Sequence, residues 1–122
     1  MNRLERGRAA EELAMEHFCR AGYAVVARNF RTRYGEIDLI VERREALVFV
    51  EVRSRSRSDF GTGLESVDLR KQRRIARVAA AFLARHRLED RAVRFDVVGV
   101  EWQDGGPVLD HVENAFEVGE GW

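Results

Sequence analysis

Asp38 and Glu51 are acidic residues in the middle of two strand-like segments, EIDLIVE and ALVFVEVRS. A polar break at residues 43–45 separates these segments, and this pattern predicts a β-hairpin. A hairpin that is symmetric about residues 44–45 places Asp38 directly opposite Glu51. Residues opposed in this way have Cβ atoms roughly 4.5–5.5 Å apart, so two carboxylates there repel each other.

Side chains alternate between the two faces of a strand, so each strand of the hairpin is expected to have one apolar face and one that carries charge. Both acids then project from the charged face. On the second strand, Val48, Val50 and Val52 oppose Phe49, Glu51 and Arg53. On the first strand, Ile37, Leu39 and Val41 oppose Glu36, Asp38, Ile40 and Glu42.

A hard divalent cation would offset the repulsion between the two carboxylates. Mg²⁺ binds carboxylate oxygens at about 2.0–2.1 Å and keeps several waters, so Asp38 and Glu51 could share one Mg²⁺ or Mn²⁺ ion. Such an ion can supply an attacking water and polarise a phosphoryl oxygen. The alternative is that both acids pair with nearby arginines on a solvated face of the sheet. A register slip of one residue would separate the two acids.

Positive charge gathers next to this hairpin, although the net charge of the 122-residue chain is zero. Residues 52–94 hold twelve Lys/Arg and five Asp/Glu, whereas residues 95–122 hold seven acids and no Lys or Arg. Guanidinium groups suit bidentate phosphate contacts, so we expect salt-sensitive binding to DNA without sequence preference. The alternative is a solvated helix face. The expected phosphate contacts are Arg53, Arg55, Arg57, Arg70, Lys71, Arg73, Arg74 and Arg77.

Hydrophobic periodicity predicts two helices. The first covers residues 8–21 and ends before Gly22 in the C′ position. The second begins after an N-cap at Ser66 and carries an apolar stripe as far as His86, with Arg70, Arg73, Arg74 and Arg77 on the opposite side. Three more strands are predicted by YAVVARNF, AVRFDVVGVEW and VLDHV. The element order α-β-β-β-α-β-β indicates an α/β fold, a mixed central sheet flanked by helices.

The length fits one domain, residues 1–122, with an acidic end at 113–122 that we expect to be flexible. No apolar run approaches the eighteen or so residues of a membrane span, and the N-terminus lacks the apolar core of a signal peptide. We therefore expect a cytoplasmic protein without membrane contact. Cys19 is the only cysteine, which excludes an internal disulfide, and it is expected to pack as a small hydrophobic residue.

The histidines do not form a recognisable catalytic motif. His17 and His86 lie on the apolar stripes of the two predicted helices and are expected to be core residues. His111 lies in the last predicted strand, and the sequence identifies no carboxylate partner for it.

Several segments together resemble a known family: GRAAE, RNFRTRYGEIDLI, LVFVEVRSR, KQRR, RFDVV and NAF, which are spread from Gly7 to Phe116. They resemble the bacterial YraN-like family of predicted endonucleases. That family is similar to archaeal Holliday junction resolvases and belongs to the PD-(D/E)xK nuclease superfamily, whose fold is a restriction-endonuclease-like mixed sheet with flanking helices. The resemblance implies Mg²⁺ or Mn²⁺ as cofactor, DNA as substrate and a possible homodimer.

The resemblance also implies roles for single residues. Asp38 and Glu51 match the acids of the two sheet motifs, which bind metal in active members, and Glu11 matches the first-helix glutamate that completes the site. The second motif normally ends in Lys, but Arg53 stands here. An arginine stays protonated, so Arg53 can hold a phosphate but cannot act as a general base. Lys71, the only lysine, could reach the site from the side or be a solvated helix residue.

Three functions follow from these observations. The first is a metal-dependent endonuclease acting on DNA, at branched or structured sites. The second is a nucleic-acid binding module that keeps the nuclease fold without useful turnover, because Arg53 replaces the usual lysine. The third is a protein-interaction domain that docks through its acidic end and basic middle segment.

Overall fold

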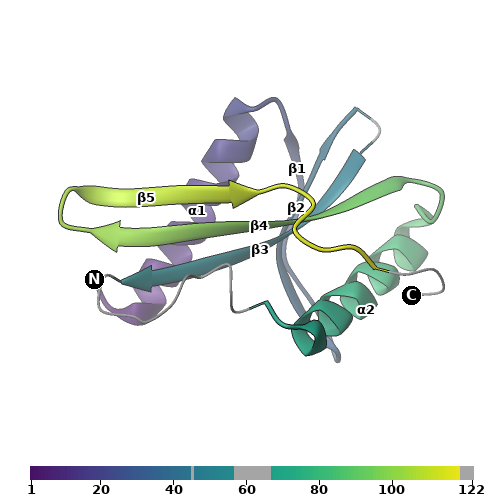
Figure 1. Cartoon of the computed structure of the whole chain (residues 1–122). Helices are drawn as coiled ribbons and strands as arrows, with labels where there is room; N and C mark the ends of the chain where they lie inside the picture. The colour runs from purple at the N-terminus through teal and green to yellow at the C-terminus, as the bar shows by residue number, and fades with distance from the viewer. Residues whose placement is uncertain (45, 57–66, 119–122) are drawn as a thin grey trace.

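The computed structural model describes residues 1–44, 46–56 and 67–118. Two helices and five strands follow each other in the predicted order α-β-β-β-α-β-β (Figure 1). The elements are α1 (Arg3–Arg20), β1 (Ala24–Thr32), β2 (Gly35–Arg43), β3 (Ala46–Ser56), α2 (Leu69–His86), β4 (Ala92–Gln103) and β5 (Gly106–Val112).

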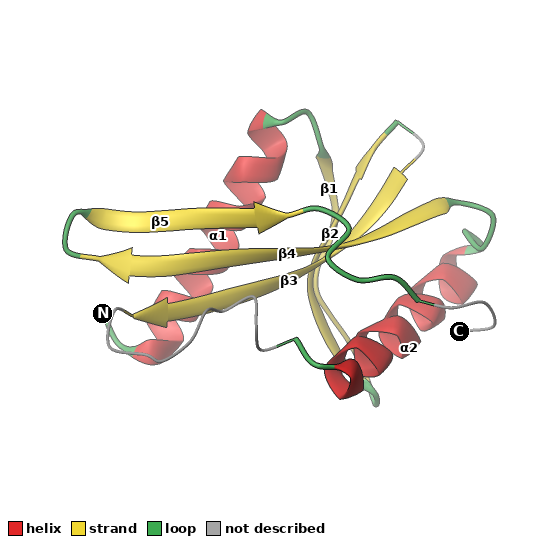
Figure 2. Ribbon diagram, viewed as in Figure 1, coloured by secondary structure: helices red, strands yellow, loops and turns green. Residues whose placement is uncertain are grey.

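The five strands form one mixed sheet in the order β1-β2-β3-β4-β5. Only β3 and β4 run parallel, and α2 lies in the crossover that parallel neighbours require. The other neighbours are antiparallel. Helix α1 lies behind the sheet in the view of Figure 2 and α2 lies on the near side. The predicted fold, a mixed α/β sheet flanked by helices, is therefore confirmed.

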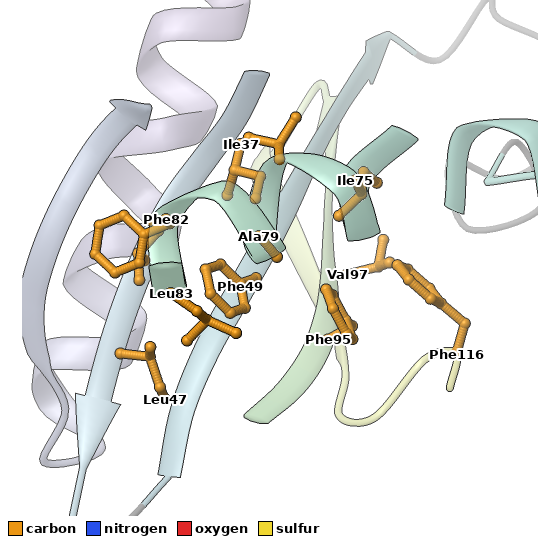
Figure 3. Close-up of a cluster of buried hydrophobic side chains, with 12 residues drawn as sticks. Ile37, Leu47, Phe49, Ile75, Ala79, Phe82, Leu83, Phe95, Val97 and Phe116 are labelled. Carbon is orange, nitrogen blue, oxygen red and sulfur yellow. The ribbon is translucent and has the colours of Figure 1, made fainter. Parts of the chain in front are cut away.

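Two apolar clusters, one on each face of the sheet, hold the helices in place. Alternation along β3 sends Val48 and Val50 toward α1 and Leu47 and Phe49 toward α2. Phe49 is fully buried, and Figure 3 shows it beneath α2 among the other aromatic and aliphatic side chains of that cluster. Burial of such side chains contributes about 1.5–3 kcal/mol each, so the faces of β3 fix where both helices sit.

Helix α1 begins earlier than the periodicity predicts. Asn2 is its N-cap, and a capping box joins the Asn2 side chain to the backbone N–H of Glu5 at 2.8 Å and the Glu5 carboxylate to the backbone N–H of Asn2 at 3.1 Å. The C-terminal end follows the prediction: Gly22 has φ +91°, and its N–H donates to the carbonyl of Cys19. This left-handed turn is one that glycine adopts readily.

Helix α2 begins after Asp68, so the predicted N-cap at Ser66 is wrong. The Asp68 carboxylate accepts the backbone N–H of Lys71 at 2.9 Å, which satisfies one of the free donors of the first turn. Ser66 itself lies outside the described residues. The prediction failed because serine and aspartate are both good caps and the sequence offers both within three positions.

The lone cysteine lies at the surface and an aromatic residue of the acidic end is buried. Cys19 is exposed, so its predicted packing in the core is wrong: it lies on the outer side of α1, whereas Phe18 beside it is fully buried. Phe116 in the acidic end is 9% exposed and stacks on Phe95; the flexibility of that end stays a prediction. Among the described residues, neither helix combines the length and apolar composition that a membrane span requires.

Candidate active site

The candidate site lies where β2 and β3 part. Their ladder runs from Arg43–Ala46 to Leu39–Val50, in the register that the symmetric hairpin predicts. Asp38 and Glu51 follow directly after this last pair. The backbone N–H of Val52 donates to Asp38 Oδ2 at 2.8 Å, so a carboxylate side chain takes the place of a ladder partner.

The side-chain alternation of β1 and β2 breaks at the same level. Asn29 and Asp38 lie between the paired residues of the β1–β2 ladder, and Asn29 has φ +50°, a left-handed conformation that asparagine tolerates better than most residues. Beyond this point Ile37 packs under α2 together with Ile40, while Leu39 packs under α1. The prediction that Ile37 shares a face with Leu39 is therefore wrong. The left-handed Asn29 of β1, at the level of Asp38 of β2, interrupts the alternation of side chains in both strands.

Asp38 and Glu51 come together at this irregularity. Burial raises the pKa of Asp38 to about 9, helped by a hydrogen bond with the Glu51 side chain, by the charge of Glu51 and by that of Glu11. Glu51 is only 9% exposed. At neutral pH Asp38 therefore keeps its proton in the absence of a metal ion.

Lys71 reaches this pair from α2. Its Nζ lies 2.9 Å from Glu51 Oε2, and its side chain is 29% exposed. The N-cap Asp68 fixes the backbone of Lys71, so the first turn of α2 aims the ammonium group at β3. Lys71, the only lysine of the chain, therefore lies at the site, which is one of its two predicted positions.

Glu11 faces the sheet from α1, as its place beside the apolar stripe predicts, whereas Glu12 is exposed and pairs with Arg28. Asn29 Nδ2 donates to Glu11 Oε1 at 3.0 Å and to Glu36 Oε1 at 2.8 Å. Asn29 thus joins two acids at the edge of the site. Sequence reasoning missed Asn29, because its only signal is a polar residue inside a strand segment.

Whether the site fits a metal ion depends on its donor set. Among the described residues, no group of three or more His, Cys, Asp or Glu side chains is arranged to hold an ion, and the Glu11 carboxylate accepts a hydrogen bond from Asn29. Metal binding by all three acids stays a prediction. Asp38 and Glu51 do fit as a pair, since two carboxylates supply the hard oxygen donors that Mg²⁺ and Mn²⁺ prefer and water completes the coordination. A metal ion there would also replace the proton that Asp38 keeps at neutral pH.

The basic residues on β3 differ in their surroundings. Arg53 is half-buried and lies two residues beyond Glu51, which places it on the same face of the strand. Arg55 is bound to Glu101 of β4 at 3.1 Å, so its charge is partly neutralised. Arg57 lies outside the described residues.

The predicted cationic side of α2 is exposed. The core-facing side of the same helix holds Ile75, Val78 and Phe82, all buried. A row of positive charge therefore begins at the helix turn that supplies Lys71 to the carboxylate pair. The exposed members are Arg70, Arg73, Arg74 and Arg77.

His111, for which the sequence identified no carboxylate partner, is paired with Asp96 in the structure. His111 Nε2 lies 2.7 Å from Asp96 Oδ2, and His111 Nδ1 lies 2.9 Å from His17 Nε2. Asp96 is 1% exposed and also binds the Arg94 guanidinium through both oxygens. The sequence hides this pair because β4 and β5 bring together residues fifteen positions apart. His86 is exposed, so its predicted place in the core is wrong.

Proteins of known sequence match this chain over most of its length, including the strands and helices that carry the site. The model of the uncharacterised protein family UPF0102 matches residues 10–100. A UPF0102 protein of Pseudomonas paraeruginosa is 44% identical over 119 residues, 95% of each chain. UPF0102 proteins of Legionella pneumophila and Frankia casuarinae are 38% and 43% identical, over 94% and 90% of this chain and 97% and 94% of their own. None of these names states an activity, so the likeness to nucleases stays a prediction.

Proposed function

This chain belongs to the UPF0102 family, and we propose that it is a metal-dependent endonuclease that hydrolyses phosphodiester bonds of DNA. The observation that carries the proposal is the pair of half-buried Asp38 and buried Glu51, with the Lys71 ammonium 2.9 Å from Glu51. Two like charges brought together under a sheet are costly unless a cation or a proton joins them. Branched or structured DNA is the substrate that the likeness to Holliday junction resolvases favours.

Each site residue has a distinct task in this proposal. Asp38 and Glu51 would hold Mg²⁺ or Mn²⁺, which when bound supplies Lewis acidity and a water of lowered pKa. Lys71, beside Glu51, donates hydrogen bonds to the attacking water or to the charge that develops on the phosphate. Arg53 contacts the scissile phosphate. Glu11 keeps Asn29 in place and supports the ion through water.

Lys71 weakens the argument against turnover that rests on Arg53. A lysine can donate and accept a proton during a reaction, whereas a guanidinium group only donates. The amine that the nuclease motif places two residues after Glu51 on the strand is supplied here from the facing helix. This arrangement supports an active site with its parts on three elements, β2, β3 and α2.

The row of exposed arginines on α2 supports DNA as the partner. Phosphate contacts made by such a row fix the orientation of a duplex without reading its bases. Because counterions are released on binding, affinity is expected to fall steeply with salt concentration. The acidic pair alone would repel DNA, so the cationic helix face is needed beside it.

A second candidate function is the binding module without turnover, which the arginine at position 53 favours. Both candidates keep the DNA-binding face, and they differ only in cleavage. The deciding experiment incubates the protein with branched, flapped and linear DNA in Mg²⁺ or Mn²⁺, beside an Asp38→Ala/Glu51→Ala double variant. Glu12→Ala is the matched control, since it removes an exposed acid of α1 outside the site.

Cleavage that requires the metal, survives Glu12→Ala and disappears in the double variant supports the nuclease. Retention of DNA by all forms without cutting supports the binding module. Cutting that persists in the double variant would place the reaction elsewhere. A Lys71→Arg variant separates the lysine's charge from its amine: cleavage should fall at least about a hundredfold if proton transfer needs the amine. An added Arg53→Lys change should restore part of the loss.

A further inference from the structure

A hollow of about 160 Å³ lies between the β1–β2 turn and the first half of α2. The turn contributes Tyr34, the start of β2 contributes Gly35 and Glu36, and the helix contributes Lys71, Arg74, Ile75 and Val78. Lys71 is the same side chain that binds Glu51, so the hollow opens beside the carboxylate pair.

Tyr34 lies at the tip of the turn and contacts neighbours on the turn and on α2. Its backbone N–H donates to Thr32 Oγ1 at 3.1 Å, and its hydroxyl accepts a hydrogen bond from Arg33 Nη2 at 2.9 Å. The guanidinium carbons of Arg33 and Arg77 lie 5.0 Å and 5.5 Å from the centre of the ring. Tyr34 is nevertheless 36% exposed and lines the hollow.

The rest of the hollow combines an apolar floor with charged side chains. Its one carboxylate, Glu36, is paired with Arg31 at 2.8 Å. Val78 is fully buried and Ile75 is 6% exposed. Gly35 has φ +144° and no side chain, and a Cβ there would lie 3.9 Å from Val78 Cγ2, so a side chain at this position would narrow the hollow. Lys71 and Arg74 add cations to the lining. The aromatic side chain of Tyr34 can stack on a planar base, and Gly35 leaves room for that base. Lys71 and Arg74 can pair with the phosphate attached to it.

We propose that this hollow binds one unpaired nucleotide of the DNA strand next to the bond that is cut. The base stacks on Tyr34, and its phosphate pairs with Arg74. This inference rests on the proposed nuclease function, since it places the nucleotide beside the carboxylate pair. A base inside a continuous duplex cannot offer its face to Tyr34. The preferred substrate is therefore a duplex with a single-stranded flap or branch, and uniform duplex is a poor one.

The test compares the affinity of the protein for two DNAs in EDTA, where no cleavage is needed. One is a continuous duplex, and the other carries a flap with 2-aminopurine at the junction. Base stacking on an aromatic ring is worth at least about a fivefold gain in affinity. The unaltered protein should prefer the flap by that factor and change the 2-aminopurine fluorescence. Tyr34→Ala should lose both effects and keep its duplex affinity, whereas Tyr34→Phe keeps the ring and should keep both.

Arg70→Ala is the matched control, because Arg70 is exposed on the same helix and does not line the hollow. It should weaken both DNAs by the same factor. If Tyr34→Ala also weakens both equally, or leaves the preference for the flap unchanged, the nucleotide site is wrong. If no form cuts DNA in Mg²⁺ or Mn²⁺ while the preference for the flap persists in EDTA, the nuclease is refuted and the nucleotide site is not. No DNA binding by the unaltered protein would overturn both.

Discussion

Replacing Asp38 by asparagine should stabilise the protein when no metal ion is present. The carboxyl group is joined to Glu51 by a hydrogen bond, and its pKa rises from 3.8 to about 9 on folding. Between these values the folded chain keeps a proton that the unfolded chain has released. The free energy of unfolding therefore falls as pH rises, by up to about 1.4 kcal/mol per pH unit. This contribution is complete below the unfolded pKa and is lost as pH rises through the folded one.

The magnitude follows from the same two values. At about pH 7 the cost of keeping Asp38 protonated amounts to at most about 4 kcal/mol. Partial exposure and coupling to Glu51 reduce it, so we expect Asp38→Asn to raise the free energy of unfolding by about 2 kcal/mol at that pH. The amide still accepts the N–H of Val52 and carries no charge. Well below the unfolded pKa the two proteins should be equally stable.

Urea unfolding in EDTA at several pH values measures this difference directly. The gap between Asp38→Asn and the unaltered protein should widen from acid to neutral pH. Glu12→Gln, which neutralises an exposed acid, should give a curve parallel to that of the unaltered protein. Millimolar Mg²⁺ should then stabilise the unaltered protein and not Asp38→Asn. Parallel curves for Asp38→Asn and the unaltered protein would refute the assignment of a proton to Asp38 at neutral pH.

Three other perturbations test the fold and the histidine cluster. Asp96→Ala should lower the free energy of unfolding by about 3 kcal/mol or more, because it leaves the Arg94 guanidinium without its bidentate partner, and urea titration measures this loss. Phe49→Ala should cost about 3–5 kcal/mol by emptying the cluster under α2, seen as a lower melting temperature; a loss below 1 kcal/mol would contradict the packing. Burial, followed by the charges of His111 and Arg20, lowers the pKa of His17. The unfolded chain therefore takes up a proton at His17 before the folded chain does, and the free energy of unfolding should fall as pH falls below 6.5. An NMR titration of the His17 ring with a midpoint at or above 6.5 would contradict this.

Local sequence pattern predicted the sheet and its central acids because the physical signals there are short in range. Two β-branched runs around a short polar break allow few registers, since a slip of one residue would exchange the side chains that face α1 for those that face α2 and would separate Asp38 from Glu51. The symmetric turn therefore predicted the pairing of Leu39 with Val50 and the meeting of Asp38 with Glu51 beyond it.

Predictions failed where a local signal had two readings. Asp68 and Ser66 are equally good helix caps in isolation, and the place of α2 against the sheet decides where the helix begins. Strict alternation misplaced Ile37, because the left-handed Asn29 interrupts β1 at a point where no glycine marks the break. Cys19 is exposed because the buried stripe of α1 passes through Phe18.

The sequence by itself determined the order of elements, the hairpin register and which acids meet on it. Only the tertiary structure decided that Lys71 pairs with Glu51, that Glu11 accepts a hydrogen bond from Asn29, and that the Tyr34 ring contacts Arg77 of α2. Each of these contacts joins two elements that pack through their apolar faces. The distance between the polar side chains in contact therefore depends on where each helix packs on its face of the twisted sheet. Periodicity reports which face of a helix is buried, and it carries no information on which turn of that helix lies over a given strand.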